Sequence, residues 1–292
     1  MAVKCRRTLQ LPKTMVDTAD MNSLQALIFD VDGTLADTEE LHRQAFNLVF
    51  HEYSIPWRWS PRLYERLLAV SGGRERIHCY MREQLTKGPA DILTPDLIKE
   101  IHARKTTCYA ELIKAGHLKL RPGVARLLGE ARAAGIRLAL ATSSARSNLD
   151  TLLDMNLPAD WRDWFAAIKT CDSVPEKKPS PAVYLAVLRA LALPATSCIA
   201  LEDTQNGLRA ARAAGLTTVI TTHRYTQGRA FPGAALVSDG LGEPDAPCTV
   251  AGGKLAGGAC VTLDALRKLL DAPPRAAERA SRAAPQHDAV AG

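Results

Sequence analysis

Two aspartates separated by one residue end the first apolar run of the sequence. Asp30 and Asp32 stand in FDVDGTLADTEELH, residues 29–42, which overlaps the end of the run LQALIF. Residues two apart along an extended strand project to the same side, so both carboxylates can face one pocket. Clustered carboxylates repel each other unless a cation neutralises them. The pair therefore indicates a cation site, because an Asx-rich turn that caps a helix explains only one of the two aspartates.

A second acidic pair strengthens this interpretation. Glu202 and Asp203 follow the apolar run SCIAL in LEDTQNG. A parallel sheet brings the carboxyl ends of its strands to one edge, where ligands bind. Three or four carboxylates at that edge would suit a hard cation with oxygen ligands, and Mg²⁺ is the natural occupant.

Groups that suit an anion follow two other predicted strands. Thr142, Ser143 and Ser144 follow LALA at the start of a predicted helix, and Lys178 lies in PEKKPSP. Taken alone, the hydroxyls have an ordinary explanation as an N-cap and the lysine as a solvated side chain. Their order along the chain, after the DxD pair and before the ED pair, favours an anion site instead.

The elements that must position these residues alternate between strand and helix. Apolar runs predict strands at 24–31, 136–144, 167–171, 196–203 and 217–222. Ala/Leu-rich helical patterns lie between the later runs, and two of them end in glycine. Strands alternating with helices imply right-handed crossovers and a parallel sheet. The predicted fold class is α/β, with a parallel-sheet, Rossmann-like core.

Residues 38–119 differ from the rest, since they are helical throughout without strand interruptions. The sequence predicts a helical cap there, inserted after the first strand and lying over its DxD end. The core then comprises 23–37 and 120–272. A flexible extension is expected at 1–22 and a disordered, low-complexity tail at 273–292.

Composition excludes several other classes of protein. The net charge is +6, but the two ends carry +2 and +1, and the body has no Lys/Arg run, which disfavours a nucleic-acid groove. No apolar run reaches the length of a membrane span. Seven scattered cysteines without a C-x-x-C pair indicate reduced thiols and a cytoplasmic location. The basic N-terminus leaves a transit peptide open, and Met21 is an alternative start. No obligate protein partner is evident.

The ordered motifs resemble the haloacid dehalogenase-like superfamily over roughly residues 25–240. The resemblance implies that Asp30 is the nucleophile and Asp32 the general acid and base. It also implies that Mg²⁺ is held by Asp30, by Asp32 through its backbone carbonyl and by Asp203, with Glu202 nearby. Thr142, Ser143 and Lys178 would bind the transferred phosphate. An acid at position 32 favours phosphoryl transfer over cleavage of a carbon–halogen bond.

Within that superfamily, LADTEELHRQAFN, SGGRERI and LEDTQNGLRAA resemble the CbbY family of sugar-bisphosphate phosphatases, which are linked to the Calvin cycle and Rubisco maintenance. The implied substrate is xylulose 1,5-bisphosphate. Glu39 and His42 would contact its sugar hydroxyls. The distal phosphate would be held by Tyr64, Arg74 and Arg76, with Gly72 and Gly73 allowing close backbone approach. Arg74 departs from the lysine expected there, which keeps the charge but changes the geometry.

Plain explanations and rival functions stay open at this point. Glu39 suits a helix start whatever the substrate, and His42 could lie on a helix surface, whereas two arginines after Gly-Gly hint at an anion. A β-phosphoglucomutase-like mutase or a phosphoglycolate phosphatase shares the core motifs. A non-catalytic Mg²⁺-binding interaction protein is a rival of another class.

Overall fold

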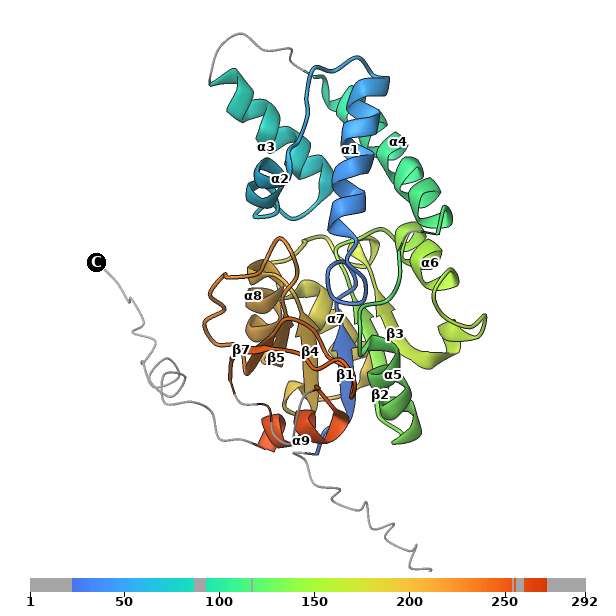
Figure 1. Cartoon of the computed structure of the whole chain (residues 1–292), viewed down its shortest axis with the longest axis vertical. Helices are drawn as coiled ribbons and strands as arrows, with labels where there is room; N and C mark the ends of the chain where they lie inside the picture. Colours follow the sequence, from blue (N-terminus) through green and yellow to red (C-terminus); the bar gives the residue numbers. More distant parts are fainter. Residues whose placement is uncertain (1–22, 87–92, 117, 254, 256–259, 272–292) are drawn as a thin grey trace, which may run out of the picture.

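The computed structural model describes residues 23–86, 93–116, 118–253, 255 and 260–271. The predictions for 1–22 and 273–292 fall outside these residues. A helical cap, made of helices α1 to α4, stands over a core built on one sheet (Figure 1).

The core is a seven-stranded sheet with the order β3-β2-β1-β4-β5-β6-β7. Its strands are β1 (Ala26–Phe29), β2 (Arg137–Ala141), β3 (Phe165–Lys169), β4 (Cys198–Glu202), β5 (Thr217–Thr221), β6 (Leu236–Ser238) and β7 (Val250–Gly252). All neighbouring pairs are parallel except β6 and β7, which are antiparallel. The predicted α/β class is confirmed, and β7 is a strand that the sequence did not indicate.

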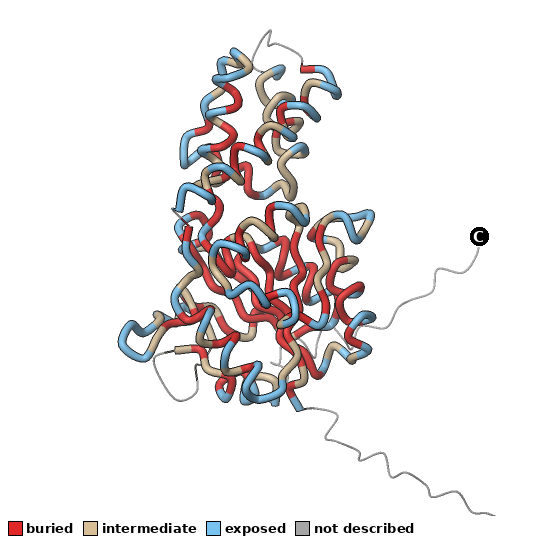
Figure 2. The backbone as a smooth tube through the Cα atoms, turned by 90° about the vertical axis from the view of Figure 1, so that its right-hand side faces the viewer, coloured by how far each residue is buried: buried red, intermediate tan, exposed pale blue. Residues whose placement is uncertain are grey.

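Both faces of the central strand are buried because helices cover both sides of the sheet (Figure 2). Leu27 and Phe29 belong to the apolar cluster that includes residues of α5 (Val124–Ala133), α6 (Arg146–Asp154) and α9 (Leu263–Asp271). Ala26 and Ile28 point the other way, into the cluster formed with α7 (Ala182–Leu191) and α8 (Gln205–Ala213). This two-sided burial explains why β1 reads as a continuous apolar run.

The cap consists of α1 (Glu39–Glu52), α2 (Pro61–Leu67), α3 (Gly73–Leu85) and α4 (Pro95–Lys114). Ser60 and Thr94 start α2 and α4 with side-chain caps, and each is followed by proline at the first helical position. Aromatic rings fill the cap interior, where the ring of Phe46 lies 4.5 Å from that of Trp59. The cap therefore has an apolar core that is continuous with the larger core cluster.

Arg121 ties the chain returning from the cap to the ends of several strands. Its guanidinium donates to the carbonyl oxygens of Gly33, Thr221, Thr222 and Asp239. The turn after β1 and the ends of β5 and β6 are thus fixed to one another by a single side chain.

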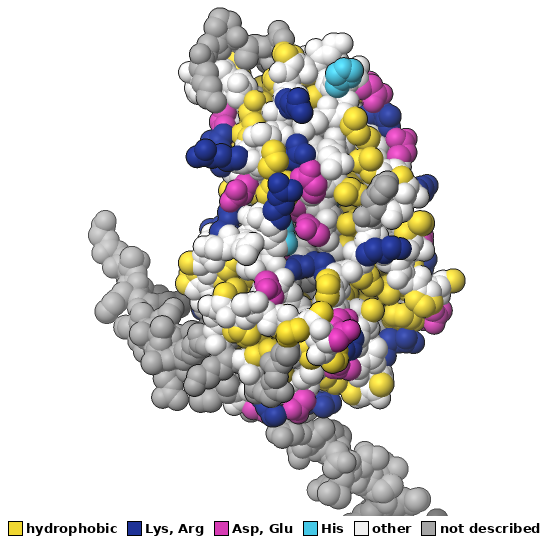
Figure 3. Space-filling model, viewed as in Figure 1, with side chains coloured by type: hydrophobic (Ala, Val, Ile, Leu, Met, Phe, Trp, Pro, Cys, Tyr) yellow, Lys and Arg dark blue, Asp and Glu magenta, His cyan; other side chains and the backbone are white. Residues whose placement is uncertain are grey.

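Three further features relate to the predictions about membranes, cysteines and surface charge. None of the described helices combines the length and apolarity that crossing a bilayer requires. The six cysteines within the described ranges are all free thiols. On the face in Figure 3, basic, acidic and apolar side chains are interspersed over cap and core.

Glycine at the start of α5 generates a prediction about stability. Gly123 has φ +83°, and a Cβ there would lie 2.4 Å from the carbonyl oxygen of Gly242. Gly135, just beyond the other end of α5, has φ +69° with open space around it. We expect Gly123→Ala to lower the free energy of unfolding by about 3 kcal/mol, through backbone strain and the clash, and Gly135→Ala by about 1 kcal/mol. Urea unfolding monitored by circular dichroism measures both, and equal losses would contradict the packing argument.

Candidate active site

A cavity of about 490 Å³ lies between the cap and the carboxyl ends of the central strands. It brings together nearly all of the predicted site residues. From the core these are Asp30, Asp32, Thr142, Ser143, Lys178, Glu202 and Asp203, and from the cap Glu39, His42, Gly72, Gly73, Arg74 and Arg76. Tyr64 is the exception, because it is fully buried beside the cavity and does not line it.

Lys178 occupies the centre of the carboxylate group. Its ammonium donates to Asp30 Oδ1 and Glu202 Oε1, both at 2.5 Å, and to the carbonyl oxygen of Ala141 at 2.8 Å. Burial disfavours its charge, but the two carboxylates outweigh burial and raise the pKa of Lys178. Lys178 therefore stays protonated at neutral pH.

One ammonium does not balance the negative charge at this edge. Burial raises the pKa of Asp30, and the charges of Glu202 and Asp203 add to that rise, while Lys178 opposes it. Burial likewise raises the pKa of Asp203 to about 6, against the hydrogen bond from His223. One ligand oxygen from each of Asp30, Glu202 and Asp203 lies within 4.8 Å of the others.

The three carboxylates have the chemistry that a divalent cation requires. Three buried carboxylates supply the oxygen donors that Mg²⁺ prefers, and their mutual repulsion adds to the larger effect of burial in raising the pKa values of Asp30 and Asp203. The predicted Mg²⁺ thus fits Asp30, Glu202 and Asp203. The side chain of Asp32 lies outside this cluster, which agrees with a role for that residue through its backbone carbonyl only.

Glu202 is fixed by its neighbours. Tyr184 OH donates to Glu202 Oε1 at 2.5 Å, in addition to the bond from Lys178. A Cβ on Gly207, in the first turn of α8, would lie 1.8 Å from Glu202 Oε2. The glycine in LEDTQNG therefore allows the helix to start directly against this carboxylate.

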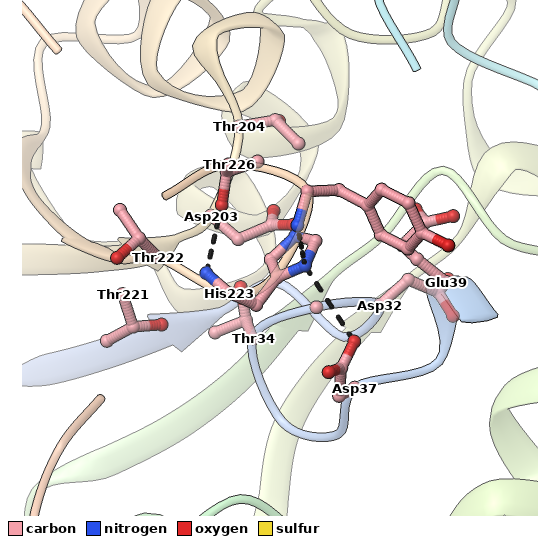
Figure 4. A network of polar contacts seen from close by, with 12 residues as sticks. Asp32, Thr34, Asp37, Glu39, Asp203, Thr204, Thr221, Thr222, His223 and Thr226 are labelled. Carbon is pink, nitrogen blue, oxygen red and sulfur yellow. Dashed lines mark hydrogen bonds and ion pairs between the residues drawn. The ribbon is translucent and has the colours of Figure 1, made fainter. Parts of the chain in front are cut away.

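Asp203 is confined in a similar way (Figure 4). Its Oδ2 accepts a hydrogen bond from His223 Nε2 at 2.9 Å. A Cβ on Gly33, which has φ +83°, would lie 2.1 Å from the same oxygen. Glycine after the DxD pair is required both for the turn and for this close approach.

Asp32 is held by donors from both cap and core. Thr38 Oγ1 and His42 Nε2 lie 2.7 Å and 3.2 Å from its Oδ1, and Ser144 Oγ donates to its Oδ2. Burial raises the pKa of Asp32, but these hydrogen bonds and the nearby imidazole outweigh it and hold the pKa well below its usual range. Asp32 is therefore ionised in this arrangement.

A lysine from α4 supports His42. Lys105 is buried, and its Nζ lies 2.7 Å from His42 Nδ1 and 4.8 Å from the ring centroid of Phe46. The His42 ring stacks on Tyr109, with the centroids 3.9 Å apart. Because the ionised carboxylate of Asp32 only accepts, His42 donates to it from Nε2 and accepts from Lys105 at Nδ1. The chain of contacts from Lys105 to Asp32 joins the cap to the core.

The predicted cap arginines have different surroundings. Arg76 donates to the carbonyl oxygen of Val70 and to Tyr64 OH, both at 2.9 Å, and lies 3.7 Å from Glu39. Arg74 is exposed and lines the cavity, and no hydrogen bond or ion pair is recorded for it within the described chain. Arg74 is thus available to a ligand, whereas Arg76 is already engaged by the protein.

Four polar contacts between described residues join the cap to the core. They are Lys177–Glu75 at 2.7 Å, Asn206–Ala69 at 2.9 Å, Arg229–Glu65 at 3.2 Å, and a hydrogen bond from Tyr225 to Glu40. Lys177, Glu75 and Asn206 also line the cavity, so two of the four contacts lie at its edge.

Several cavity residues were not anticipated from the sequence. Ser144 was noted only as the last of the three hydroxyl residues after LALA, without a role of its own. Five further residues that line the cavity were not assigned to the site: Lys99, His102, Lys105, Thr106 and Lys177. One signal was present for Lys105, because it occupies a position on the buried stripe of α4 otherwise taken by Ile98, Ile101 and Cys108. A lysine at such a position needs a buried polar partner.

Comparison with known proteins agrees with this geometry. A family model for haloacid dehalogenase-like hydrolases matches residues 24–215. The chain is 51% identical over 224 residues to the plasmid-borne CbbY protein of Cupriavidus necator, covering 77% of this chain and 88% of that protein.

Solved structures of CbbY from Rhodobacter sphaeroides are also similar. The complex with phosphate has a TM-score of 0.69 at 42% identity, and it covers 74% of this chain and 94% of that one. A mutant in complex with xylulose 1,5-bisphosphate has a TM-score of 0.69 at 41% identity, with the same coverage. The predicted resemblance to this family is confirmed.

Lys105 generates a prediction about pH. Burial, together with the charge of Arg76, lowers the pKa of Lys105 to about 7. An unfolded lysine keeps its proton to about pH 10, so between pH 7 and 10 the unfolded state binds more protons and this group makes stability rise with pH. We expect Lys105→Met to remove that rise and to stabilise the protein below pH 7, by roughly 2 kcal/mol.

Urea unfolding at pH 6, 8 and 9.5 measures this slope. Lys114→Met, at an exposed position of the same helix, serves as the matched control and should leave the slope unchanged. A Lys105→Met profile parallel to that of the unaltered protein would show that Lys105 does not titrate in this range.

Proposed function

Because the chain belongs to the haloacid dehalogenase-like hydrolases, and within them to the CbbY proteins, we propose that it is a phosphatase of xylulose 1,5-bisphosphate. The observation that carries the proposal is the cavity itself. One end gathers Asp30, Lys178 and Asp203, and the cap contributes Arg74, a cation without a partner in the described chain. The substrate is that of the similar CbbY structure from Rhodobacter sphaeroides, which contains this bisphosphate.

The cation belongs to the same proposal. Asp30 and Asp203 would hold Mg²⁺ with Glu202 beside them, the set of carboxylates that fits a dication. When bound, Mg²⁺ neutralises charge where an anionic carboxylate meets an anionic phosphate. The ammonium of Lys178, already 2.5 Å from Asp30, contributes to the same neutralisation.

Asp30 is the proposed nucleophile. A carboxylate oxygen forms a bond to phosphorus while the bond from phosphorus to the sugar oxygen breaks, which leaves an aspartyl-phosphate. Asp32 gives a proton to the departing oxygen, then takes one from the water that cleaves the intermediate. Thr142 and Lys178, both buried and lining the cavity, would hold phosphoryl oxygens.

The two roles of Asp32 require its pKa to change during turnover. With Thr38, His42 and Ser144 in contact, Asp32 is ionised, which suits its action as a base. A phosphate dianion entering the cavity places like charge nearby and raises the pKa of this carboxyl, which favours the protonated form needed for the first step.

The cap would recognise the rest of the substrate. Glu39 and His42 line the cavity, and Glu39 would contact sugar hydroxyls, whereas both ring nitrogens of His42 are already engaged by Lys105 and Asp32. Arg74 would bind the distal phosphate. The close approach expected at Gly72 and Gly73 is made by the protein itself, because a Cβ on either glycine would lie within 2.6 Å of Glu75, Lys177 or His102. Arg76 and Tyr64 would act by holding Glu39 in place, since Tyr64 OH donates to Glu39 at 2.8 Å. A cytoplasmic location and a role in Rubisco maintenance stay predictions.

Phosphate release with Mg²⁺ tests the proposal. The substrates are xylulose 1,5-bisphosphate, ribulose 1,5-bisphosphate, β-glucose 1-phosphate and 2-phosphoglycolate. We expect the xylulose bisphosphate to have the highest kcat/KM. Formation of an isomerised sugar phosphate without release of free phosphate would instead identify a mutase. A preference for 2-phosphoglycolate would identify a phosphoglycolate phosphatase.

Replacing the nucleophile should abolish turnover while leaving the fold intact. We expect Asp30→Asn to lower kcat by about 10⁴-fold or more, because the amide cannot form the phosphorylated intermediate. Asp163→Asn, at an exposed position remote from the cavity residues, is the matched control. Steady-state phosphate release and circular dichroism measure activity and fold, and residual activity within tenfold of the unaltered enzyme would rule Asp30 out as nucleophile.

Arg74 should distinguish bisphosphates from monophosphates. We expect Arg74→Ala to raise KM for xylulose 1,5-bisphosphate by about 10- to 100-fold, through loss of a charge-assisted contact, and to change KM for β-glucose 1-phosphate little. Arg66→Ala, on the exposed surface of α2, is the control for loss of positive charge on the cap. Equal effects on both substrates would exclude a distal-phosphate role.

A further inference from the structure

A buried histidine behind the cation site is not used by the mechanism above. His223 follows β5, the strand next to β4, and only 7% of its surface is exposed. No motif in the sequence singles out this histidine. In Figure 4 its ring lies between Asp203 and Asp37.

The contacts of the ring fix its tautomer. The backbone N–H of Tyr225 donates to His223 Nδ1 at 3.4 Å, so Nδ1 is an acceptor in the neutral ring. Nε2 then carries the hydrogen and donates to Asp203 Oδ2 at 2.9 Å. Asp37 Oδ1 lies 3.7 Å from Nδ1, where it would pair with the ring if Nδ1 also carried a proton.

The loop that carries the ring is itself restrained. The backbone N–H of His223 donates to Thr226 Oγ1 at 3.0 Å, and the carbonyl of Thr222 accepts from Arg121. The rings of His223 and Tyr225 meet edge to face with their centroids 6.2 Å apart. The imidazole is therefore held in one orientation before any ligand binds.

This arrangement controls how Asp203 faces the cavity. Oδ2 is occupied by His223 and crowded by Gly33, whereas Oδ1 has no hydrogen-bond partner within the described residues. A carboxylate with one oxygen fixed and the other free cannot rotate without breaking the bond to His223. The free oxygen is thereby presented as a ligand.

We propose that His223 is a positioning residue that holds the Asp203 carboxylate for the divalent cation. The proposal rests on the proposed function only in taking Mg²⁺ as the ion that Asp203 binds. The other side of the ring lines a second cavity of about 300 Å³, together with Asp37 and Arg121. Because the ring lies between this cavity and Asp203, a smaller side chain would admit water behind the carboxylate.

The test uses two variants of similar size. Leucine at 223 fills the space without a donor, whereas glutamine offers an N–H at about the place of Nε2. The full-length protein, stripped of metal, is titrated with MgCl₂ by calorimetry without substrate. We expect His223→Leu to weaken Mg²⁺ binding by about 10- to 100-fold and His223→Gln to recover most of that loss.

A second readout separates positioning from general damage to the fold. The rise in melting temperature caused by Mg²⁺ should shrink in His223→Leu, and kcat should approach that of the unaltered enzyme once MgCl₂ is saturating. His51→Leu, at the exposed end of α1, is the control for loss of a histidine. An unchanged dissociation constant for Mg²⁺ in His223→Leu, or equal losses in both 223 variants, would overturn the proposal.

Failure of the proposed function has a different signature. If the unaltered protein binds Mg²⁺ and His223→Leu weakens that binding, the positioning role holds even when xylulose 1,5-bisphosphate is not hydrolysed. If the bisphosphate is hydrolysed and His223→Leu binds Mg²⁺ normally, the positioning role alone is overturned.

Discussion

The repulsion among three buried carboxylates is the constraint on which the rest of the structure depends. Asp30, Glu202 and Asp203 come from the ends of adjacent strands, and in a parallel sheet their meeting is unavoidable. Lys178 lies between two of them and offsets part of the repulsion. Tyr184 then fixes Glu202 by a hydrogen bond, and Gly207 and Gly33, which lack a Cβ, allow the backbone to pass close to Glu202 and Asp203. A site kept in this state has a strong affinity for positive charge.

The cap adds contacts that the core cannot supply. Asp32 belongs to the core, yet its protonation is governed by His42, and His42 depends on Lys105 from α4. The set of hydrogen bonds to Asp32 is thus complete only when α1 and α4 lie over the sheet. Pairs such as Lys177–Glu75 stabilise the contact between cap and core. The position of the cap and the protonation of Asp32 are therefore linked.

Most of the architecture was predictable because local patterns and topology agree. The apolar run before Asp30 and the run before Glu202 each predict a strand, and the parallel order brings their ends together. His223 and Tyr184 were not predictable as site residues, because their roles depend on contacts between elements far apart in sequence. For Lys105 the buried stripe of α4 predicted a polar partner but not which residue it would be. Tyr64 shows the limit of transferring motifs, because the structure buries it behind Glu39. β7 is short and antiparallel, and its sequence carries no strong apolar pattern.

The position of β1 in the sheet has a consequence for how the chain is assembled. Ala26 pairs with Arg137 on one side and Cys198 on the other, so the central strand finds both neighbours only after the cap, which lies between it and them in the sequence, has been synthesised. Closing so long a loop is slow and entropically costly. Helices α1 to α4 form from local contacts and can shorten that loop by folding first. A cap inserted directly after β1 therefore brings this central strand closer to β2 and β4 before the sheet forms.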